Sequence, residues 1–261
     1  MTENLHNRTT PHPAGSSQSV PEKAGKDRAD QTRERILRAA VREFSEHGLA
    51  GARTDAIAEE AKVNKALLYY YFKSKAKLYA AALEDAATRV AQMALSAAEP
   101  GATPGERVLR MALNHFDRIT SQHEFQNLMQ QEMVRFHRGE SESLPQLAQI
   151  VFQPVMQKAL EAVCEAIKRG ELCSVDPLQV IYSAFGANVF YFLSAPIMRL
   201  TAQFEPFDPA VVEERRNTAI RFLGSALFVD RKHGAEVANR VLQSVPMPEV
   251  KKNPPAWRKT T

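Results

Sequence analysis

The sequence from Thr54 to Leu78, TDAIAEEAKVNKALLYYYFKSKAKL, decides how the chain is interpreted. It contains a short helical pattern, a tight turn and a second helical pattern rich in tyrosine. It also contains five lysines within a run that has no acidic residue: Lys62, Lys65, Lys73, Lys75 and Lys77. Lysines interleaved with aromatic side chains are typical of surfaces that meet phosphates. We therefore expect a DNA-binding head, which the rest of the chain pairs and controls.

The chain is long enough and apolar enough to fold around a sizeable core. It has 261 residues, 44% of them hydrophobic, which argues against global disorder. Residues 1–79 carry 14 Lys and Arg against 10 Asp and Glu, so the whole formal net charge of +4 lies with the head. A basic head on a neutral body indicates that the head alone meets a polyanion.

Cysteine usage and hydropathy bear on where the protein works. Cys164 and Cys173 are too few for a disulfide framework, and the N-terminus lacks the apolar core of a signal peptide, so we expect a cytoplasmic location. A redox switch between these cysteines would need a rearrangement across a helix end. Pro177 to Met198 contains 22 residues without charge, enough to cross a bilayer. Because no basic cluster follows it, we favour a helix buried in protein.

Both ends of the chain have the composition of tails. Residues 1–29 are rich in Pro, Ser, Thr and Gly, and we expect a flexible arm. Its basic residues could reach a minor groove, but a solvated tail is the simpler interpretation. Residues 233–261 form a C-terminal tail, partly disordered, with a weaker helix at 235–244. Between the tails we expect a DNA-binding domain at 30–79 and a helical body at 80–232.

Helix boundaries in the head follow from caps and breakers. Asp30 is a plausible N-cap for a first helix, which Gly48 ends as a left-handed cap. Its apolar stripe has helical spacing and comprises Ile36, Leu37, Ala40, Val41 and Phe44. Thr54 caps a second helix, and Asn64 caps a third that follows after only two residues. A support helix followed by two helices and a tight turn is the helix-turn-helix arrangement.

The remaining pattern is helical, without a strand pattern or an internal repeat. Lys73 and Ser74 break the third helix, and Pro154 is expected to bend the helix that contains it. We predict an all-α fold of about nine helices, those after the third lying at 75–96, 106–122, 124–137, 145–169, 177–200 and 209–232.

Residues 33–79 resemble the DNA-binding domain of the TetR family of bacterial transcription regulators. The resemblance rests on Ile57-Ala58, Val63-Asn64-Lys65-Ala66, Leu68-Tyr69-Tyr70-Tyr71-Phe72-Lys73-Ser74-Lys75 and Leu78. It covers under a fifth of the chain, but the combined motif is specific. It implies a homodimer with a helical effector-binding and dimerisation domain, acting as a ligand-responsive repressor. Lys62 departs from the pattern, because the family usually has glycine there and a left-handed lysine costs about 1 kcal/mol.

Nine residues are expected at the DNA. A recognition helix enters the major groove by its N-terminal end, which places four of them nearest the bases: Asn64, Lys65, Ala66 and Leu67. Lys65 can donate to guanine, whereas Ala66 and Leu67 can pack on a thymine methyl group. Helix N-termini favour phosphates at Thr54 and Lys75. The resemblance adds three tyrosines, at the groove edge and at phosphates: Tyr69, Tyr70 and Tyr71.

In the body, the resemblance implies a pocket between the middle helices. The candidate lining residues are mostly methionine and aromatic: Met111, His115, Phe116, Phe125, Met129, Met133, Phe152, Met156, Tyr182, Phe185 and Asn188. Such a lining suits a small, largely apolar or aromatic effector, although any one of these residues could equally belong to an ordinary core. Asn188 is the most informative, because a buried amide needs a partner. Helices 177–198 and 209–232 are the candidates for the dimer interface, with the second contributing a stripe of Ile220, Leu223 and Leu227.

Other functions have weaker support. No pair among five acidic and histidine residues has the i, i+4 spacing of a helical zinc motif, so we expect no metal: His115, His123, Glu124, Glu132 and His137. The sequence has no Gly-rich phosphate loop, nucleophile elbow or paired catalytic carboxylates, so we expect neither an enzyme nor a cofactor. The expected partners are a near-palindromic DNA operator and a small effector. Two alternatives stay open: a regulator controlled by a protein partner, and a helical enzyme or membrane-associated protein with an incidental basic face.

Overall fold

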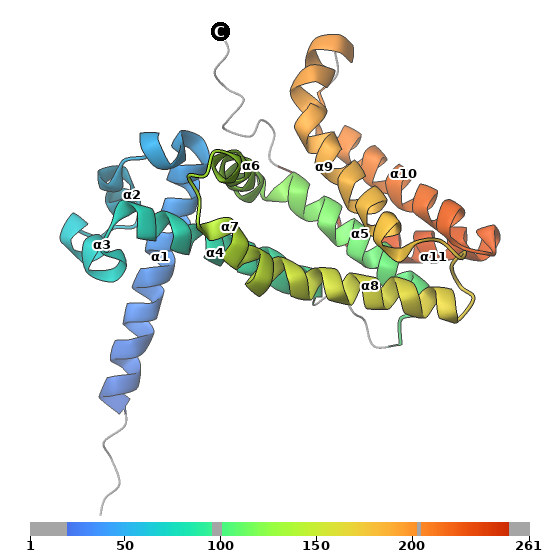
Figure 1. The fold of residues 1–261 in the computed structure, drawn as a ribbon, viewed down its shortest axis with the longest axis horizontal. Helices are drawn as coiled ribbons and strands as arrows, with labels where there is room; N and C mark the ends of the chain where they lie inside the picture. Colours follow the sequence, from blue (N-terminus) through green and yellow to red (C-terminus); the bar gives the residue numbers. More distant parts are fainter. Residues whose placement is uncertain (1–19, 96–100, 203–204, 251–261) are drawn as a thin grey trace, which may run out of the picture.

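The structure, a computed structural model, describes residues 20–95, 101–202 and 205–250 (Figure 1). These residues confirm the all-α prediction, since their only β-type pairing is an isolated bridge between Leu172 and Phe228. The elements in chain order are α1 (Val20–Gly51), α2 (Thr54–Glu60), α3 (Lys65–Phe72), α4 (Lys75–Leu95), α5 (Pro104–Ser121), α6 (His123–His137), α7 (Ser143–Leu147), a π-helical turn η1 (Ala148–Phe152), α8 (Gln153–Lys168), α9 (Pro177–Ala202), α10 (Pro209–Leu227) and α11 (Arg231–Ser244).

Helix α1 begins at Val20, so the start predicted at Asp30 is wrong. The backbone from residue 20 onward is helical, while the rest of the predicted arm, residues 1–19, lies outside the described residues. Pro21 stands in the first turn, where a missing N–H costs no helical hydrogen bond. At Gly48 φ is +67° and ψ is 177°, a combination essentially restricted to glycine. The regular helix therefore ends at Gly48, although its ψ is not that of a left-handed helical residue.

The two short helices of the head are set by their caps. Helix α2 has Arg53 at its N-cap and makes no side-chain cap bond, so the prediction that Thr54 caps it is off by one residue. Helix α3 starts as predicted, because Asn64 Oδ1 accepts the Leu67 N–H at 2.7 Å. Ser74 Oγ accepts a backbone N–H at the start of α4. The head's inner surface is formed by buried residues of α1, α2 and α3: Ile36, Leu37, Phe44, Ile57, Ala58, Leu68 and Phe72.

The head and the body share one hydrophobic core. The cluster that contains Phe44 and Leu68 continues through α4 into residues of α6, α7 and η1: Phe125, Leu128, Leu147 and Val151. Helix α4 runs from the head into the body, behind the α7–α8 segment in the view of Figure 1. The buried apolar surface therefore continues across the boundary predicted between residues 79 and 80.

A buried carboxylate lies at this junction. Glu132 of α6 is fully buried and accepts hydrogen bonds from Tyr79 Oη at 3.0 Å, from Arg135 Nη1 at 2.9 Å and from Ser141 Oγ. Burial, reinforced by the neighbouring carboxylate, raises the pKa of Tyr79, so the phenol remains a donor. The Tyr79 ring also packs edge-on against Phe44, with ring centroids 5.1 Å apart. Glu132 thus joins α6 to α4 through Tyr79, and the Tyr79 ring joins α4 to α1.

The predicted bend at Pro154 takes the form of a π-helical turn. Helices α7 and α8 are continuous through η1, which ends directly before the first turn of α8. Pro154 lies in that turn and has no N–H to donate to the preceding one. A local widening of the helix accommodates this missing hydrogen bond.

The C-terminal part differs from its prediction. The single helix predicted at 209–232 is two helices, because Phe228 has extended backbone angles and Asp230 then caps α11. Gly224 and Gly234 let α10 and α11 touch, since a Cβ at Gly224 would lie 2.5 Å from the Gly234 carbonyl oxygen. Helix α11 buries Val237, Ala238 and Val241, so the tail predicted from residue 233 belongs to the body as far as this helix. Residues 251–261 lie outside the described part.

Helix α9 is less buried than the sequence suggested. It is long and apolar enough to cross a membrane by length and composition alone, and 44% of its most apolar window is buried in the protein. One side packs on α5 and α8, while six large apolar residues of the helix are exposed: Leu178, Tyr182, Phe190, Leu193, Ile197 and Leu200. The single chain thus buries only one side of the helix that was expected to be buried in protein, and the other side is left open, as a candidate for the dimer interface would be.

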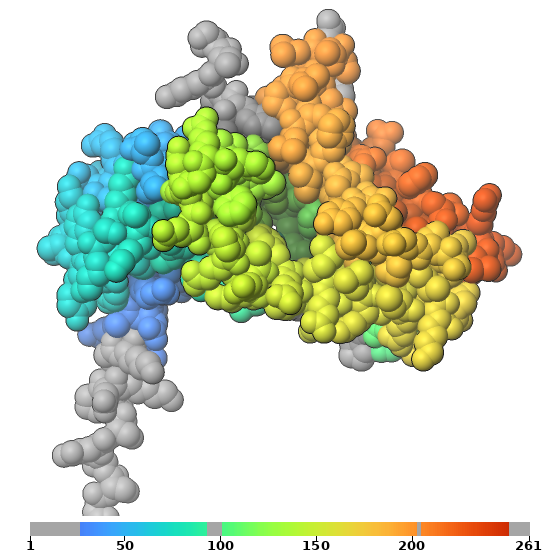
Figure 2. All heavy atoms as spheres, viewed as in Figure 1, coloured from blue at the N-terminus to red at the C-terminus, as the bar shows by residue number. Residues whose placement is uncertain are grey.

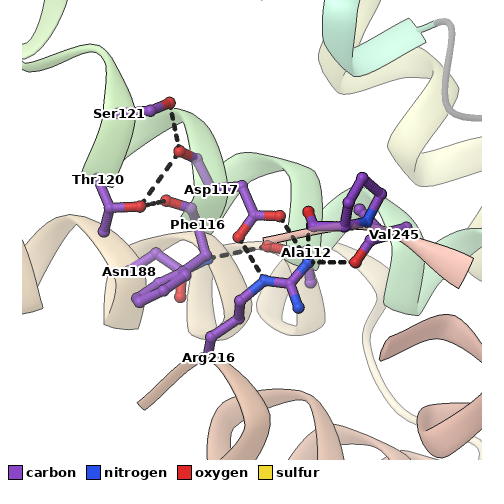
Figure 3. Close-up of polar contacts among 9 residues, drawn as sticks. Ala112, Phe116, Asp117, Thr120, Ser121, Asn188, Arg216 and Val245 are labelled. Atoms are coloured by element: carbon purple, nitrogen blue, oxygen red, sulfur yellow. Dashed lines mark hydrogen bonds and ion pairs between the residues drawn. The ribbon is translucent and has the colours of Figure 1, made fainter. Parts of the chain in front are cut away.

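The strongest polar contact between α5 and α10 is a buried ion pair (Figure 3). Arg216 donates from Nε and Nη2 to the two carboxylate oxygens of Asp117, at 2.7 and 2.9 Å, and also to the Val245 carbonyl at 2.9 Å. Both side chains are nearly inaccessible to solvent. Burial raises the pKa of Asp117, and the two hydrogen bonds from Arg216 oppose that rise. The pair thus holds the segment after α11 and α10 against α5.

Breaking this pair on one side should destabilise the fold strongly. Arg216→Met leaves Asp117 buried without its cation, and we expect a loss of about 3–5 kcal/mol in the free energy of unfolding. Asp117→Asn combined with Arg216→Met removes both charges and should recover most of that loss. Urea unfolding of the parent, the single variants and the double variant measures this. A single-variant loss below about 1 kcal/mol would contradict the assigned role.

Candidate nucleic-acid interface

The N-terminal end of α3 is held so that its first residues face outward. Leu68 and Phe72 are buried against α1 and α2, as predicted for core residues. Asn64, Lys65 and Ala66 are exposed, and Leu67 is half-buried. The four residues expected nearest the bases therefore lie together at one end of α3. Their contact with bases stays a prediction.

Lys65, the expected base reader, already has a partner within the head. Its ammonium nitrogen lies 2.9 and 3.0 Å from the two carboxylate oxygens of Asp55, in the first turn of α2. The hydrogen bond that Lys65 donates to Asp55 raises the pKa of Lys65, so this lysine is charged at neutral pH. Both side chains are about half exposed, a setting in which ion pairs contribute little to stability. Asp55 therefore orients Lys65 but also places an acid close to the expected DNA surface.

The three tyrosines of α3 have different surroundings. Tyr70 is 70% exposed, and its ring lies 5.2 Å from the Lys73 ammonium group in a cation–π contact. Tyr69 is half-buried, with its hydroxyl 3.3 Å from Thr54 Oγ1. Tyr71 is half-buried and donates to the Ala29 carbonyl of α1 at 3.4 Å. Tyr70 is thus the most accessible to a phosphate, whereas the other two also bind within the head.

The two residues expected at phosphates through helix N-termini also have internal partners. Thr54 is 8% exposed, and its hydroxyl faces Tyr69. Lys75 is half-buried at the start of α4 and donates to the Ala50 carbonyl at 2.9 Å. An ammonium group has three donors, so two remain for other acceptors. Lys75 can therefore bind a phosphate without releasing Ala50.

The turn between α2 and α3 accommodates the lysine that departs from the family pattern. Lys62 has φ +56°, the left-handed backbone that the position was expected to require. The turn is closed by the Val63 N–H, which donates to the Ala58 carbonyl at 2.9 Å. Lys73 has φ +64° as well, which the sequence pattern did not reveal. Two strained lysines therefore flank α3.

Arg53 is a basic residue of this surface that the sequence pattern did not single out. It is exposed at the N-cap of α2, and its backbone N–H donates to Glu43 Oε1 at 2.8 Å. Its place directly before the helix start is the signal that could have identified it.

A cavity of about 150 Å³ lies in the body between α4, α5, α6, the α7–α8 segment and α9. Six of the predicted pocket residues line it: Met111, His115, Phe125, Phe152, Met156 and Phe185. Figure 2 shows the surface hollowed between α8 and α9, with α5 visible at the base. The remaining lining includes two polar residues that the prediction missed, Arg118 and Gln126.

Five of the predicted pocket residues lie elsewhere. Phe116 is buried in a separate cluster with Tyr191 and Phe207. Met129 packs on the core shared with the head, whereas Met133 and Tyr182 are 50% and 60% exposed. Helical spacing alone does not say which side of each helix faces the cavity, so the sequence does not separate these residues from the true lining.

Asn188 lies behind the cavity wall and supports His115. Its amide nitrogen donates to the Ala112 carbonyl at 3.1 Å and lies 3.3 Å from His115 Nδ1. Because an amide N–H donates, Nδ1 accepts and the ring proton lies on Nε2. Burial, followed by the charge of Arg118, lowers the pKa of His115 to about 3. His115 is therefore neutral at physiological pH and stacks on Phe185, with ring centroids 4.4 Å apart.

Within the described residues, no group of three or more His, Cys, Asp or Glu side chains could hold a metal ion. His115 and His123 lie instead against aromatic rings, and Glu132 is bound at the junction of head and body. Cys164 and Cys173 are both free.

Comparisons with known proteins agree with the geometry of the head. Residues 36–82 match the sequence model of the bacterial regulatory proteins of the tetR family. The chain is 53% identical over 55 residues to the transcriptional repressor SCO4008 of Streptomyces coelicolor, and 50% identical over 56 residues to the repressor NicS of Pseudomonas putida. These matches cover 21% and 22% of this chain, and they span only 29% and 26% of the length of those relatives.

Solved structures extend the likeness to the body. SCO4942 of Streptomyces coelicolor matches 83% of this chain and 99% of its own, with 25% identity and a TM-score of 0.54. The ketosteroid regulator KstR2 of Mycobacterium tuberculosis matches 76% of this chain and 95% of its own, with 16% identity and a TM-score of 0.58, which indicates a shared fold alone. The head, at residues 36–82, therefore matches the tetR family of bacterial regulatory proteins, and the body shares the fold of solved structures of regulators.

Proposed function

We propose that the protein is a transcription regulator that binds a near-palindromic operator and represses transcription until an effector binds its body. The observation that carries this proposal is the exposed N-terminal end of α3, with Lys65 at its start, in a head that is about half identical to those of two repressors. Helix α3 enters the major groove, where Lys65 exchanges Asp55 for the acceptors of a guanine.

Contacts to phosphates position the head on the duplex. The exposed Tyr70 lies on α3, Lys75 lies at the start of α4, and Arg53 lies at the start of α2. Such contacts carry no sequence information, but they make affinity fall steeply as salt rises.

Two copies of the chain pair through α9 and α10. The supporting observation is a row of exposed apolar residues on α9, of which Phe190 is 69%, Ile197 62% and Leu200 84% exposed, together with Phe222 of α10 at 67%. Of the stripe expected at the interface, Ile220 is buried in the core of its own chain, and Leu223 and Leu227 are half-buried against that core. An exposed apolar surface of this kind favours burial against an identical surface in a two-fold dimer.

Effector control acts through α4. This helix contributes Ala87, Val90 and Ala91 to the cavity and carries Leu78 and Tyr79 in the core shared with the head. A ligand changes operator affinity only if it binds two arrangements of the dimer with different affinity. The cavity and the head share α4, so a displacement at one changes the packing of the other.

Lys65 and Lys75 should differ in their effect on DNA binding. Lys65→Ala is expected to cost about 1–3 kcal/mol at the preferred operator and to relax base preference, because it removes a contact to a base. Lys75→Ala is expected to weaken binding to all duplexes alike. It should also lower the slope of log affinity against log salt concentration by about one, because one phosphate contact is lost.

Fluorescence anisotropy with operator and scrambled duplexes over a range of salt concentrations measures both effects. Lys168→Ala, at the end of α8 and far along the chain from the head, is the matched control and should bind like the parent. The assignment of α3 as the recognition helix is wrong if Lys65→Ala retains both the affinity and the base preference of the parent.

Replacing Asp55 should have the opposite effect to replacing Lys65, because it should raise the affinity for DNA. Asp55→Asn removes an acid that repels phosphates and frees the ammonium group of Lys65, so affinity for duplex DNA should rise several-fold at low salt. Glu84→Gln, an exposed acid farther along α4, removes the same charge as a control. Equal affinities of Asp55→Asn and the Glu84 variant would show that the Lys65–Asp55 pair has no bearing on DNA.

The dimer interface is tested by placing a charge on α9. Phe190→Asp should shift the protein from dimer to monomer, because the buried apolar surface of the interface would contain an unpaired carboxylate. Sedimentation equilibrium measures the shift, with Ile150→Asp, also exposed but on η1, as the control. A dimer that survives Phe190→Asp and dissociates with Ile150→Asp would place the interface elsewhere.

A further inference from the structure

Arg118 is a charged side chain buried in the wall of a mostly apolar cavity. It is 5% exposed and lines the cavity with His115 and Gln126 among apolar neighbours. Of its five N–H donors, Nη1 donates to the Val90 carbonyl, and Nε is buried without a hydrogen-bond partner among the described residues. A buried guanidinium whose Nε–H has no partner is costly, because that donor has lost water and gained no hydrogen bond in return.

The acid next to Arg118 in sequence does not neutralise it. Asp117 uses both carboxylate oxygens for Arg216, as Figure 3 shows. Asp117 attracts the Arg118 charge at longer range, and burial lowers the pKa of Arg118 to about 10. The guanidinium therefore keeps its charge at neutral pH. The buried guanidinium groups of Arg118 and Arg216 both interact with the single carboxylate of Asp117, so these three side chains carry a net positive charge.

The other polar groups of the cavity cannot supply the missing anion. Among the residues that the structure describes, no Asp or Glu lines the cavity. His115 is neutral, and with Nδ1 accepting from Asn188 its Nε2 carries a proton that it can donate. Gln126 offers an amide donor as well. The polar atoms of the wall thus consist largely of donors, and their natural complement is an acceptor with negative charge.

The rest of the cavity wall determines how large and how apolar a bound ligand can be. Valine, methionine and phenylalanine side chains form most of it, including Val151, Phe152, Val155 and Met156. A volume of about 150 Å³ accommodates a body of about the size of benzene, as apolar cavities of that size do. A doubly charged or larger polar group would place a charge against apolar side chains.

We propose that the cavity binds a small apolar monocarboxylate, aromatic or branched, whose carboxylate pairs with Arg118 while its apolar body packs against the α7–α8 segment. This deepens the function proposed above, since it names the class of the effector and the residue that selects it. Arg118 also links the ligand to α4, because Val90, whose carbonyl it binds, belongs to that helix. A carboxylate that draws the guanidinium towards the cavity competes with this bond and loosens α5 from α4.

The test compares acids with their uncharged amides of the same shape. The full-length protein is titrated calorimetrically with benzoate and benzamide, phenylacetate and phenylacetamide, and hexanoate and hexanamide. We expect at least one acid to bind about tenfold or more tightly than its amide, because a charge-assisted hydrogen bond replaces a neutral one. Equal binding of every acid and amide, or no binding by any acid at millimolar concentration, would overturn the proposal.

Variants at Arg118 test whether its guanidinium group causes the preference for acids over amides. Arg118→Met keeps an unbranched apolar stem but removes the guanidinium, and it should abolish the preference for acid over amide, whereas Arg118→Lys should keep part of it. Lys158→Met, exposed on α8, is the matched control and should bind like the parent. An acid preference that persists in Arg118→Met would overturn the role of Arg118. If that variant fails to fold, the acid–amide comparison on the parent together with Arg118→Lys still decides.

DNA affinity is measured separately, with and without the acid. An acid that binds through Arg118 but leaves operator affinity unchanged would contradict effector control and leave the ligand class standing. Operator binding without any acid preference would contradict the ligand class and leave the DNA-binding function standing.

Discussion

The buried carboxylate of Glu132 is the contact on which the relation between head and body depends. A fully buried carboxylate is tolerated only where its hydrogen bonds are satisfied, and three donors meet it here: Tyr79 of α4, Arg135 of α6 and Ser141 of the following loop. Any rotation of α4 against α6 breaks one of these bonds inside a low-dielectric core. The junction therefore favours a small number of discrete arrangements over continuous bending, which is the property that a two-state switch requires.

Helix α4 connects the head, the core that head and body share, and the cavity of the body. Near its start α4 carries Lys75, which binds the end of α1, and one turn later Tyr79 enters the shared core. Near its end α4 lines the cavity and receives the bond from Arg118. In a dimer paired through α9 and α10, a shift of α4 changes the separation of the two heads. Operator half-sites lie about 34–36 Å apart, so a small change in that separation costs affinity at both.

The sequence predicted the head better than the body because local rules act there. Asn64 as a cap, the break at Lys73 and the inward side of α3 all follow from neighbours within a few residues. The errors in the body arise from tertiary context: the break between α10 and α11 depends on Phe228 pairing with Leu172, and the side of α10 that faces inward depends on α5. The partners of Lys65 and Lys75, Asp55 and Ala50, lie on other elements and could not be read from helical spacing. The sequence did not predict Arg118 as a lining residue of the cavity, because an arginine in a helix is ordinarily exposed and only the packed structure shows it buried.

The central claim is that two copies of this chain read a specific duplex through α3. Selection of duplexes from a random pool by the purified protein tests it most directly, with the bound sequences determined after several rounds. We expect enrichment of a near-palindrome whose half-sites are one helical turn or a multiple of it apart, and loss of that enrichment with Lys65→Ala. A pool that remains random, or an enriched sequence that is the same for the parent and Lys65→Ala, would contradict it.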